Sequence, residues 1–330
     1  MKIVVIGASG HVGGYLVPAL VGEGHQVVAV SRGRHRPYRE DPAWERVEQV
    51  VADREADDES GGFAARIAAL DADVVVDLIC FTEASAGRLV EALRGRVRQL
   101  VHIGTIWVNG YLTQVPATED EPRRPWGEYG TQKAAIERLL LDESRRPGGL
   151  PVAIVHPGHI TGPGWPIIGP QGTVDVAVWR TLATGGELML PGFGLETVHH
   201  VHAADVAQLV GRCIAAPERA NGEAFYAVSP RAVTMRGLAE AAAGWFGRDA
   251  VLRFAPFDEF AATLASDEFR SSALDHVARS PSLSIEKAHR LLGYAPAYTS
   301  LQAVAEAVEW LRADGRLGDG IPPVRVAAAG

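Results

Sequence analysis

Cysteine is scarce in this sequence of 330 residues, which contains only Cys80 and Cys213. Both lie in apolar runs and have no partner at a spacing that would suggest a bridge or a ligand pair. This scarcity argues against a disulfide framework and against a cysteine-based metal site. It is typical of a protein of the reducing cytoplasm, and we expect this localisation.

Long apolar runs and excess positive charge are also missing. No apolar segment reaches 18 residues, and the chain does not begin with a charged stretch followed by an apolar one. We therefore expect neither a membrane span nor a signal peptide. The formal net charge of -8 argues against a nucleic-acid partner. A content of 47% hydrophobic residues is enough to bury the core of a protein of enzyme size.

The first 14 residues combine a short apolar run with three regularly spaced glycines, Gly7, Gly10 and Gly13. This pattern predicts a strand, a tight turn and a helix whose free amides face a pyrophosphate. The spacing G-x-x-G-x-x-G departs from the common G-x-G-x-x-G fingerprint. A strand–helix turn without a ligand would also use glycine, so this alternative stays open.

The remaining sequence alternates short apolar runs with helical patterns, which predicts an α/β fold with a doubly wound, Rossmann-like parallel sheet. We expect a dinucleotide-binding domain at 1–160 and a smaller C-terminal substrate domain at 161–330, with segments near 187–215 returning to the first. The strand at 187–190 is expected in the large domain, the segment 222–228 in the small one, and a surface tail from 319 onward. The Pro/Gly-rich loop 165–172 is either a lid or a simple connector.

The residue after the second predicted strand bears on the choice of cofactor. An acidic residue there would bind the ribose 2′-hydroxyl of NAD, but this chain has arginines at Arg32, Arg34 and Arg36. Arginine favours a 2′-phosphate, and we therefore predict NADP, with NAD as the alternative. The arginines could equally belong to a solvated loop.

Tyr129 and Lys133 lie four positions apart in a helical pattern and share one face of that helix. An ammonium beside a phenol stabilises the phenolate and can lower the tyrosine pKa from its usual value of about 10. Thr105, at the end of a predicted strand, supplies a hydroxyl for the same ligand oxygen. Tyrosine and lysine at this spacing also occur as an exposed helix pair.

Together these motifs resemble those of the extended short-chain dehydrogenases/reductases, the NAD(P)-dependent epimerase/dehydratase family. Further similar motifs are VAIVHPGHITGP at 152–163, VHAADVA at 201–207 and LGYAP at 292–296. The resemblance implies a catalytic set of Thr105, Tyr129 and Lys133. It also implies that the cofactor is held by Gly7, Ser9, Gly10, His11, Val12, Gly13, Arg32, Asp53, Arg54, Leu78, Ile79, Cys80, Tyr129, Lys133, Pro157 and Gly158.

Several positions depart from the family pattern. His159 stands where nucleotide-sugar enzymes often have asparagine, and Asn109 replaces an aromatic residue. Ile106 follows Thr105 where sugar dehydratases have an acidic pair, so a dehydratase reaction is disfavoured because isoleucine cannot serve as an acid or base.

Five histidines cluster in the sequence at positions 156–202, and a metal site is one interpretation. The interpretation that we prefer has no metal, and has His159 and either His199 or His200 lining the substrate pocket. Trp107, His159 and His200 are the candidate substrate contacts.

We expect an NAD(P)-dependent oxidoreductase or epimerase that transfers hydride at a secondary alcohol or ketone of a sugar-like or natural-product substrate. A nucleotide-sugar epimerase with permanently bound NAD is the alternative. A non-catalytic RNA-binding or cofactor-sensing protein is a third possibility. By resemblance, the partner is a small-molecule substrate, and a homodimer forms through helices near 85–93 and 130–141.

Overall fold

The apolar runs of the first half of the chain come together in one parallel sheet. The computed structural model describes residues 1–326. Across the sheet, the strands are β3 (Glu48–Val51), β2 (Gln26–Ser31), β1 (Lys2–Ile6), β4 (Val74–Asp77), β5 (Gln99–Ile103), β6 (Val152–Pro157) and β11 (Glu223–Ala227). All neighbours are parallel. The strand order reverses between β1 and β4, which creates a ligand-binding crevice at their carboxyl ends. The predicted fold class is confirmed.

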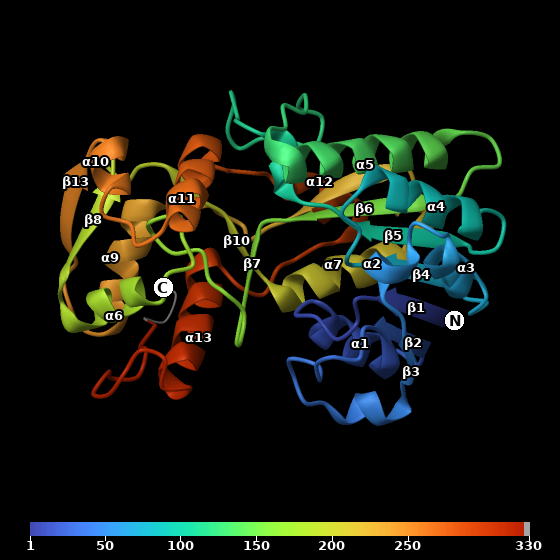
Figure 1. Ribbon diagram of the computed structural model, residues 1–330, viewed down its shortest axis with the longest axis horizontal. Helices are drawn as coiled ribbons and strands as arrows, with labels where there is room; N and C mark the ends of the chain where they lie inside the picture. Colours follow the sequence, from blue (N-terminus) through green and yellow to red (C-terminus); the bar gives the residue numbers. More distant parts are fainter. Residues whose placement is uncertain (327–330) are drawn as a thin grey trace.

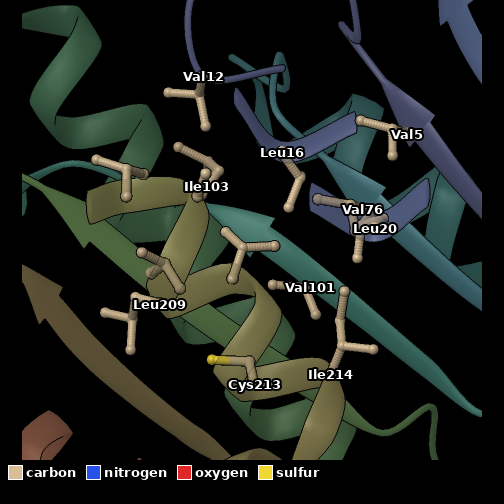
Figure 2. Packing of buried hydrophobic residues seen from close by; sticks show 14 of the residues in the cluster. Val5, Val12, Leu16, Leu20, Val76, Val101, Ile103, Leu209, Cys213 and Ile214 are labelled. Carbon is tan, nitrogen blue, oxygen red and sulfur yellow. The ribbon is translucent and has the colours of Figure 1, made fainter. Parts of the chain in front are cut away.

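Helices cover both faces of this sheet (Figure 1). One face packs against α1 (Gly13–Gly22) and α7 (Ala203–Ala215), and the other against α3 (Gly62–Ala68), α4 (Glu83–Leu93) and α5 (Gly127–Arg145). Neighbouring residues of a strand serve opposite faces, so Val5 joins the first core and Val4 the second. Figure 2 shows Leu16 and Leu20 of α1 and Leu209 of α7 converging on the sheet.

A smaller lobe forms the other half of the molecule (Figure 1). Its core is shared by α6 (Ala177–Thr184), α9 (Met235–Trp245), α13 (Ser300–Ala313) and β8 (Glu187–Pro191). The strand β13 (Val251–Ala255) pairs with β8, and α10 (Phe257–Ala261) and α11 (Asp267–Arg279) follow it. Between the lobes, β7 (His159–Thr161) pairs with β10 (His200–His202).

Short elements complete the chain. They are the β9–β12 pair (Thr197–Val198, Val233–Thr234), α2 (Arg54–Asp57), α8 (Pro217–Ala220), α12 (Glu286–Leu292) and the 3₁₀ helices η1 (Pro42–Arg46) and η2 (Ile106–Asn109). Within residues 1–326, no helix combines the length and apolar character needed to cross a membrane.

Two strand placements differ from the prediction. The strand at 187–190 pairs with β13 in the small lobe, whereas the segment 222–228 supplies β11, the outermost strand of the large sheet beside β6. The reason lies in burial: β11 is buried along most of its length, as suits a strand covered by helices, while β8 begins with an exposed residue. Sequence position alone could not distinguish the two sheets.

The segment from 319 to 326 has no helix or strand, but it is anchored to the small lobe. The amide of Val324 donates to Glu309, and that of Arg325 to the carbonyl of Trp245. The last part of the predicted tail, 327–330, lies outside the described residues.

The start of α1 packs against the preceding turn so closely that only glycine fits at Gly13. A Cβ there would lie 2.1 Å from the carbonyl oxygen of Ala8. We expect Gly13→Ala to lower the free energy of unfolding by about 1–3 kcal/mol, because the helix must move away from the turn. Urea unfolding of the purified protein measures this loss.

Gly22, near the other end of α1, is the matched control because a Cβ there would meet nothing within 4 Å. Gly22→Ala is expected to stabilise the protein by up to about 1 kcal/mol, since alanine favours the helix. Equal effects of the two substitutions would contradict the packing argument.

Candidate active site

The turn between β1 and α1 has the form of an anion-binding cradle. Gly7 has a φ of +83°, and a Cβ on it would lie 2.8 Å from a side-chain carbon of Ile79. No side chain of residues 1–326 caps the N-terminus of α1, and the amides of Gly14 and Tyr15 donate to the carbonyls of Gly10 and Val12. The amides of residues 11–13 make no such bond within the described chain and are available to an anion. The turn therefore fits the pyrophosphate of a dinucleotide.

One pocket runs from this turn past the end of β5 to the start of α5. It brings together most of the predicted cofactor and catalytic residues, namely Gly7, Gly10, His11, Val12, Gly13, Leu78, Ile79, Thr105, Tyr129, Lys133, Pro157 and Gly158. The lining also includes Phe81, Ile103, Gly104, Ile160 and Trp165, which the sequence analysis did not assign to it.

Ser9 and Arg32 lie outside this pocket. Ser9 lines a neighbouring cavity together with Ser31, Arg34, His35 and Arg36. Arg32 lies 4.0 Å from Glu55 in an exposed ion pair and does not line that cavity. The positive charge at the end of β2 is therefore presented by Arg34 and Arg36.

Asp53 and Arg54, predicted at the adenine edge, have structural partners. Asp53 caps α2 and pairs with Arg34 at 3.0 Å. Arg54 is buried and donates to both carboxylate oxygens of Asp77, at 2.8 and 2.9 Å, and to Ser85. Asp77 in turn accepts from the amide of Ile79, which lines the pocket. Arg54 thus supports the pocket wall from behind.

Cys80 was predicted to lie along the cofactor, but its side chain is completely buried and is not part of the pocket lining. Burial raises the pKa of the thiol to about 11. The thiol is therefore protonated at neutral pH and packs as a small apolar group.

Thr105, Tyr129 and Lys133 line this pocket together, and Tyr129 is 42% exposed. Thr105 is the N-cap of η2, and its hydroxyl oxygen accepts from the amide of Trp107 at 3.3 Å. Lys133 is only 2% exposed, and its ammonium donates to the carbonyl of Ile103 at 2.9 Å. The same nitrogen lies 6.0 Å from the centre of the Tyr129 ring. The ammonium is near the tyrosine and is anchored to the end of β5.

The electrostatics of these groups differ from the expected low tyrosine pKa. Burial raises the pKa of Tyr129, although its interaction with the Thr105 hydroxyl acts in the opposite direction. Burial lowers the pKa of Lys133 to about 8, with Cys80 and Asp77 opposing this shift. In the protein's own environment, the phenol is therefore a proton donor at neutral pH.

Trp107 and His159, two of the three predicted substrate contacts, line a second pocket. The Trp107 ring lies 5.9 Å from the Tyr129 ring, and the pocket also contains His276 and Arg279. The Nε2 atom of His159 is buried and has no hydrogen-bond partner among residues 1–326. This atom is available to a polar group of a ligand.

Arg279 carries the positive charge of this second pocket. Its guanidinium lies between two indole rings, 3.9 Å from the centre of Trp107 and 3.8 Å from that of Trp126. It also forms an ion pair with Asp275 on the same helix, α11. The charge is therefore compensated, and the pocket is mainly aromatic.

His200 was the third predicted substrate contact, and it lies in the core. Its Nε2 is 2.8 Å from the carbonyl oxygen of Ile168. His199 is equally buried, with Nε2 2.8 Å from the carbonyl of Ser229. Burial lowers the pKa of both histidines to about 4, so both are neutral. Among residues 1–326, no group of three or more His, Cys, Asp or Glu side chains is placed to hold a metal ion.

The first residue of the loop 165–172, Trp165, packs against the glycine turn. The Trp165 ring stacks on His11, with the ring centres 5.0 Å apart and the planes 6° from parallel. Both side chains line the main pocket. The loop therefore does more than connect two elements, because it supplies part of the wall.

Sequence reasoning missed His276 and Arg279 because α11 was not predicted. Ser266 and the acidic residues that follow it are a helix-start signal that could have located this helix. No spacing in the sequence indicates that α11 returns to Trp107.

The assembled groups can carry out acid–base chemistry next to a bound dinucleotide. They comprise a phenol that can give a proton, a hydroxyl that can bind the same oxygen, and an ammonium that can stabilise the resulting phenolate.

Comparison with known proteins agrees with this chemistry. The model of the "NAD dependent epimerase/dehydratase family" matches residues 3–228. The 2′-dehydrokanamycin reductase of Streptomyces kanamyceticus is 28% identical over 324 residues, covering 97% of this chain and 87% of the reductase. The UDP-glucose 4-epimerase of Mycolicibacterium smegmatis is 28% identical over 336 residues, covering 94% of this chain and 99% of the epimerase.

Solved structures show the same fold. The UDP-glucuronic acid 4-epimerase from Bacillus cereus, in complex with UDP-glucuronic acid and NAD, superposes with a TM-score of 0.70 at 18% identity. The superposition covers 95% of this chain and 99% of the epimerase chain.

The buried ammonium of Lys133 should reduce the stability of the protein. Its pKa is about 8 in the folded chain against 10.5 for a free lysine, so unfolding takes up a proton between these values and stability rises with pH in that window. At pH 7 Lys133 is protonated in both the folded and the unfolded state, so the folded protein bears the full free-energy cost of burying this charge. We expect Lys133→Met to raise the free energy of unfolding at pH 7 by about 1–3 kcal/mol. Urea titrations at pH 7 and pH 10 measure this gain and its decrease.

Lys287 is the control, because its ammonium is paired with Glu223 at 2.7 Å. Lys287→Met is expected to give no gain. A Lys133→Met protein that is less stable than the wild type at pH 7 would contradict the assignment of an uncompensated charge.

Proposed function

The chain belongs to the NAD dependent epimerase/dehydratase family, and from this premise we propose that it is an NADP-dependent reductase of a small ketone. The family match confirms the resemblance that the motifs indicated. The chain is thus an enzyme of the short-chain dehydrogenase/reductase type, a group whose members include both the reductase and the epimerase described above.

One observation carries the proposal: Thr105, Tyr129 and Lys133 line the same pocket as the glycine turn. A nicotinamide bound there would supply the hydride. The phenol of Tyr129 would give its proton to the carbonyl oxygen, and the Thr105 hydroxyl would donate a hydrogen bond to that oxygen. Lys133 would stabilise the phenolate that remains.

The protonation of Tyr129 is compatible with a reductase. Because burial raises the pKa of this phenol, the group is protonated at neutral pH. A protonated phenol suits the reduction of a ketone, whereas oxidation of an alcohol requires a phenolate as base.

The preference for NADP is supported by the cavity at the end of β2. Arg34, Arg36 and Ser31 line it together with Ser9 of the glycine turn. Arg36 has no ion-pair partner among residues 1–326, whereas Arg34 is shared with Asp53 and would have to turn toward the ligand. Both can bind a 2′-phosphate through charge-assisted hydrogen bonds. The absence of an acidic residue directly after β2 removes the usual ligand of the 2′-hydroxyl of NAD.

The substrate pocket supports a small molecule without a diphosphate. Arg279 is compensated by Asp275, and the pKa of both His159 and His276 is lowered by burial. Trp107 supplies a flat apolar wall. A diphosphate would therefore meet no net positive charge here, which favours an uncharged ketone over a nucleotide sugar.

The assembly and location of the protein remain predictions. The resemblance implies a homodimer, and α4 and α5, which pack together on one face of the sheet, would pair across its two-fold axis. The cytoplasmic localisation likewise rests on the sequence.

The cofactor proposal predicts that charge removal at the β2 cavity affects NADPH alone. We expect Arg34→Ala and Arg36→Ala each to weaken NADPH binding by about 10-fold or more, because a charge-assisted hydrogen bond to the 2′-phosphate is lost. NADH binding should change by less than about 2-fold. Quenching of tryptophan fluorescence measures both affinities.

Arg32→Ala is the matched variant, because Arg32 lies outside the cavity. If only Arg32→Ala selectively lost NADPH binding, Arg32 would be the residue that binds the 2′-phosphate, as the sequence analysis expected. Equal binding of NADPH and NADH by the wild-type protein would contradict the proposal.

The catalytic proposal predicts that Tyr129→Phe lowers ketone reduction by about 100-fold or more, since the proton donor is lost. The assay follows NADPH absorbance with a panel of 2′-keto aminoglycosides and aromatic ketones. Tyr111→Phe is the control, because Tyr111 is exposed and lines neither pocket. Retained activity in Tyr129→Phe would exclude Tyr129 as the donor. RNA binding without reduction of any ketone would favour the non-catalytic alternative.

Native mass spectrometry distinguishes the reductase from an epimerase. A reductase releases its oxidised cofactor after each turnover, whereas an epimerase keeps NAD bound while hydride leaves and returns. A purified protein that retains one NAD per chain would favour the epimerase alternative.

A further inference from the structure

A buried polar network lies directly behind the catalytic pocket, and the proposed chemistry does not use it. Its centre is His156 of β6, whose side chain has no exposed surface. Glu137 of α5 lies beside it and is only 5% exposed. Charged groups buried this deeply are costly and call for a physical explanation.

His156 contacts the catalytic threonine through the backbone. The Nδ1 atom accepts a hydrogen bond from the amide of Thr105 at 3.0 Å. The chain makes room for the ring at Gly104, where a Cβ would lie 2.2 Å from Nδ1. The imidazole therefore occupies the space that a side chain at position 104 would fill. It also accepts a hydrogen bond from the amide of the next residue, Thr105.

The contact with Thr105 and the charge of Glu137 favour the same tautomer of His156. A ring nitrogen that accepts a hydrogen bond carries no proton, so the proton of the neutral ring is on Nε2. The carboxylate of Glu137 lies 3.2 Å from Nε2. The ring N–H is not aligned well enough on the oxygen for a good hydrogen bond, but the negative charge still favours the proton on that side.

Glu137 is kept ionised. Burial opposes its ionisation, but His156 and Arg123 together hold the pKa of the carboxyl well below its usual range. Arg123 donates to both carboxylate oxygens, at distances from 2.7 to 3.2 Å. It also donates to Asn109 at 2.8 Å and to the Tyr226 hydroxyl at 3.0 Å.

We propose that Glu137 and His156 are positioning residues, which orient Thr105 through its backbone amide so that its hydroxyl faces the substrate oxygen. The proposal rests on the proposed function. The Thr105 hydroxyl oxygen already accepts from Trp107, which leaves its hydrogen for Tyr129 or for a ligand. Glu137 follows Lys133 and Tyr129 at intervals of four residues, so α5 carries proton chemistry and positioning on one face.

The surroundings of His156 keep the ring neutral, as its contact with Thr105 requires. Burial lowers the pKa of the imidazole most, Glu137 raises it, and Arg123 and Lys133 lower it further. His102 of β5 and Tyr226 of β11 also face the ring. A protonated ring would carry a hydrogen on Nδ1 and could no longer accept from Thr105.

The test uses nuclear magnetic resonance, which requires neither substrate nor turnover. In the wild-type protein, ¹⁵N spectra of the imidazoles should show His156 as the Nε2–H tautomer. In Glu137→Gln, the negative charge is lost, and we expect the Nδ1–H tautomer to become populated and the Thr105 amide resonance to shift. Observation of the Nδ1–H tautomer in the wild-type protein would overturn the proposal without any variant.

Glu143→Gln is the matched control. Glu143 is also a buried glutamate of α5 and is paired with Arg94, but it has no contact with His156. This variant should lose stability without changing the tautomer of His156 or the Thr105 amide resonance. If both variants changed these signals equally, the role of Glu137 would be general stability alone.

The ring itself is tested by two substitutions. His156→Asn keeps an oxygen near the position of Nδ1 and should retain the Thr105 contact, whereas His156→Phe keeps volume but has no acceptor. With ¹³C-labelled tyrosine, we expect the Tyr129 pKa to rise in His156→Phe, because the Thr105 hydroxyl is displaced, and to stay near its wild-type value in His156→Asn. Equal behaviour of the two variants would overturn the proposal.

Activity is a separate readout. Where a reducible ketone is found, kcat should fall by up to about 100-fold in His156→Phe with little change in KM, as expected for a misplaced catalytic group. If the wild-type protein reduces no ketone, the proposed function fails, while the tautomer and the Tyr129 titration still decide the positioning role.

Discussion

The site depends on keeping one ammonium, that of Lys133, in a place almost without water. Its carbonyl partner at the end of β5 compensates only part of the lost hydration. What holds the lysine there is the apolar side of the same helix, because Ile136 and Leu140 of α5 are buried in the core against the sheet. Burial of these side chains offsets the cost of the charge, and the reactive face of α5 is thereby held at the sheet edge.

Other charges near the pocket are arranged as compensated pairs. Arg54 with Asp77 supports the wall at β4, Arg123 with Glu137 lies behind β5, and Arg279 with Asp275 borders the substrate side. Within the described part of the chain, Lys133 is the one cationic side chain that lines the main pocket, and no carboxylate pairs with it. Its field therefore acts on the phenol and on ligands without competition from a neighbouring salt bridge.

The sequence was sufficient to predict the sheet, the glycine turn and the helix that carries Tyr129 and Lys133, because each is encoded by local periodicity or by a spacing of three or four residues. It did not show which sheet β8 and β11 join, since pairing partners are selected by tertiary packing. It also missed the network around His156. Arg123, Glu137 and His156 are separated in the chain. Only the fold shows that the half-buried Arg123 donates to Glu137, while the amide of Thr105 donates to the neighbouring His156.

The path of the chain between the lobes limits how the enzyme can be recombined with its relatives. The chain first contributes α6 and β8 to the small lobe and then returns to the large sheet with α7 and β11. The chain then builds much of the small lobe, sends Ala288 and Leu292 of α12 back into the core of the large lobe, and ends with α13 in the small one. A chimaera with one junction would therefore combine mismatched halves of both cores. Exchange of substrate specificity by lobe grafting requires several junctions, and α7, β11 and α12 must stay with the parental sheet.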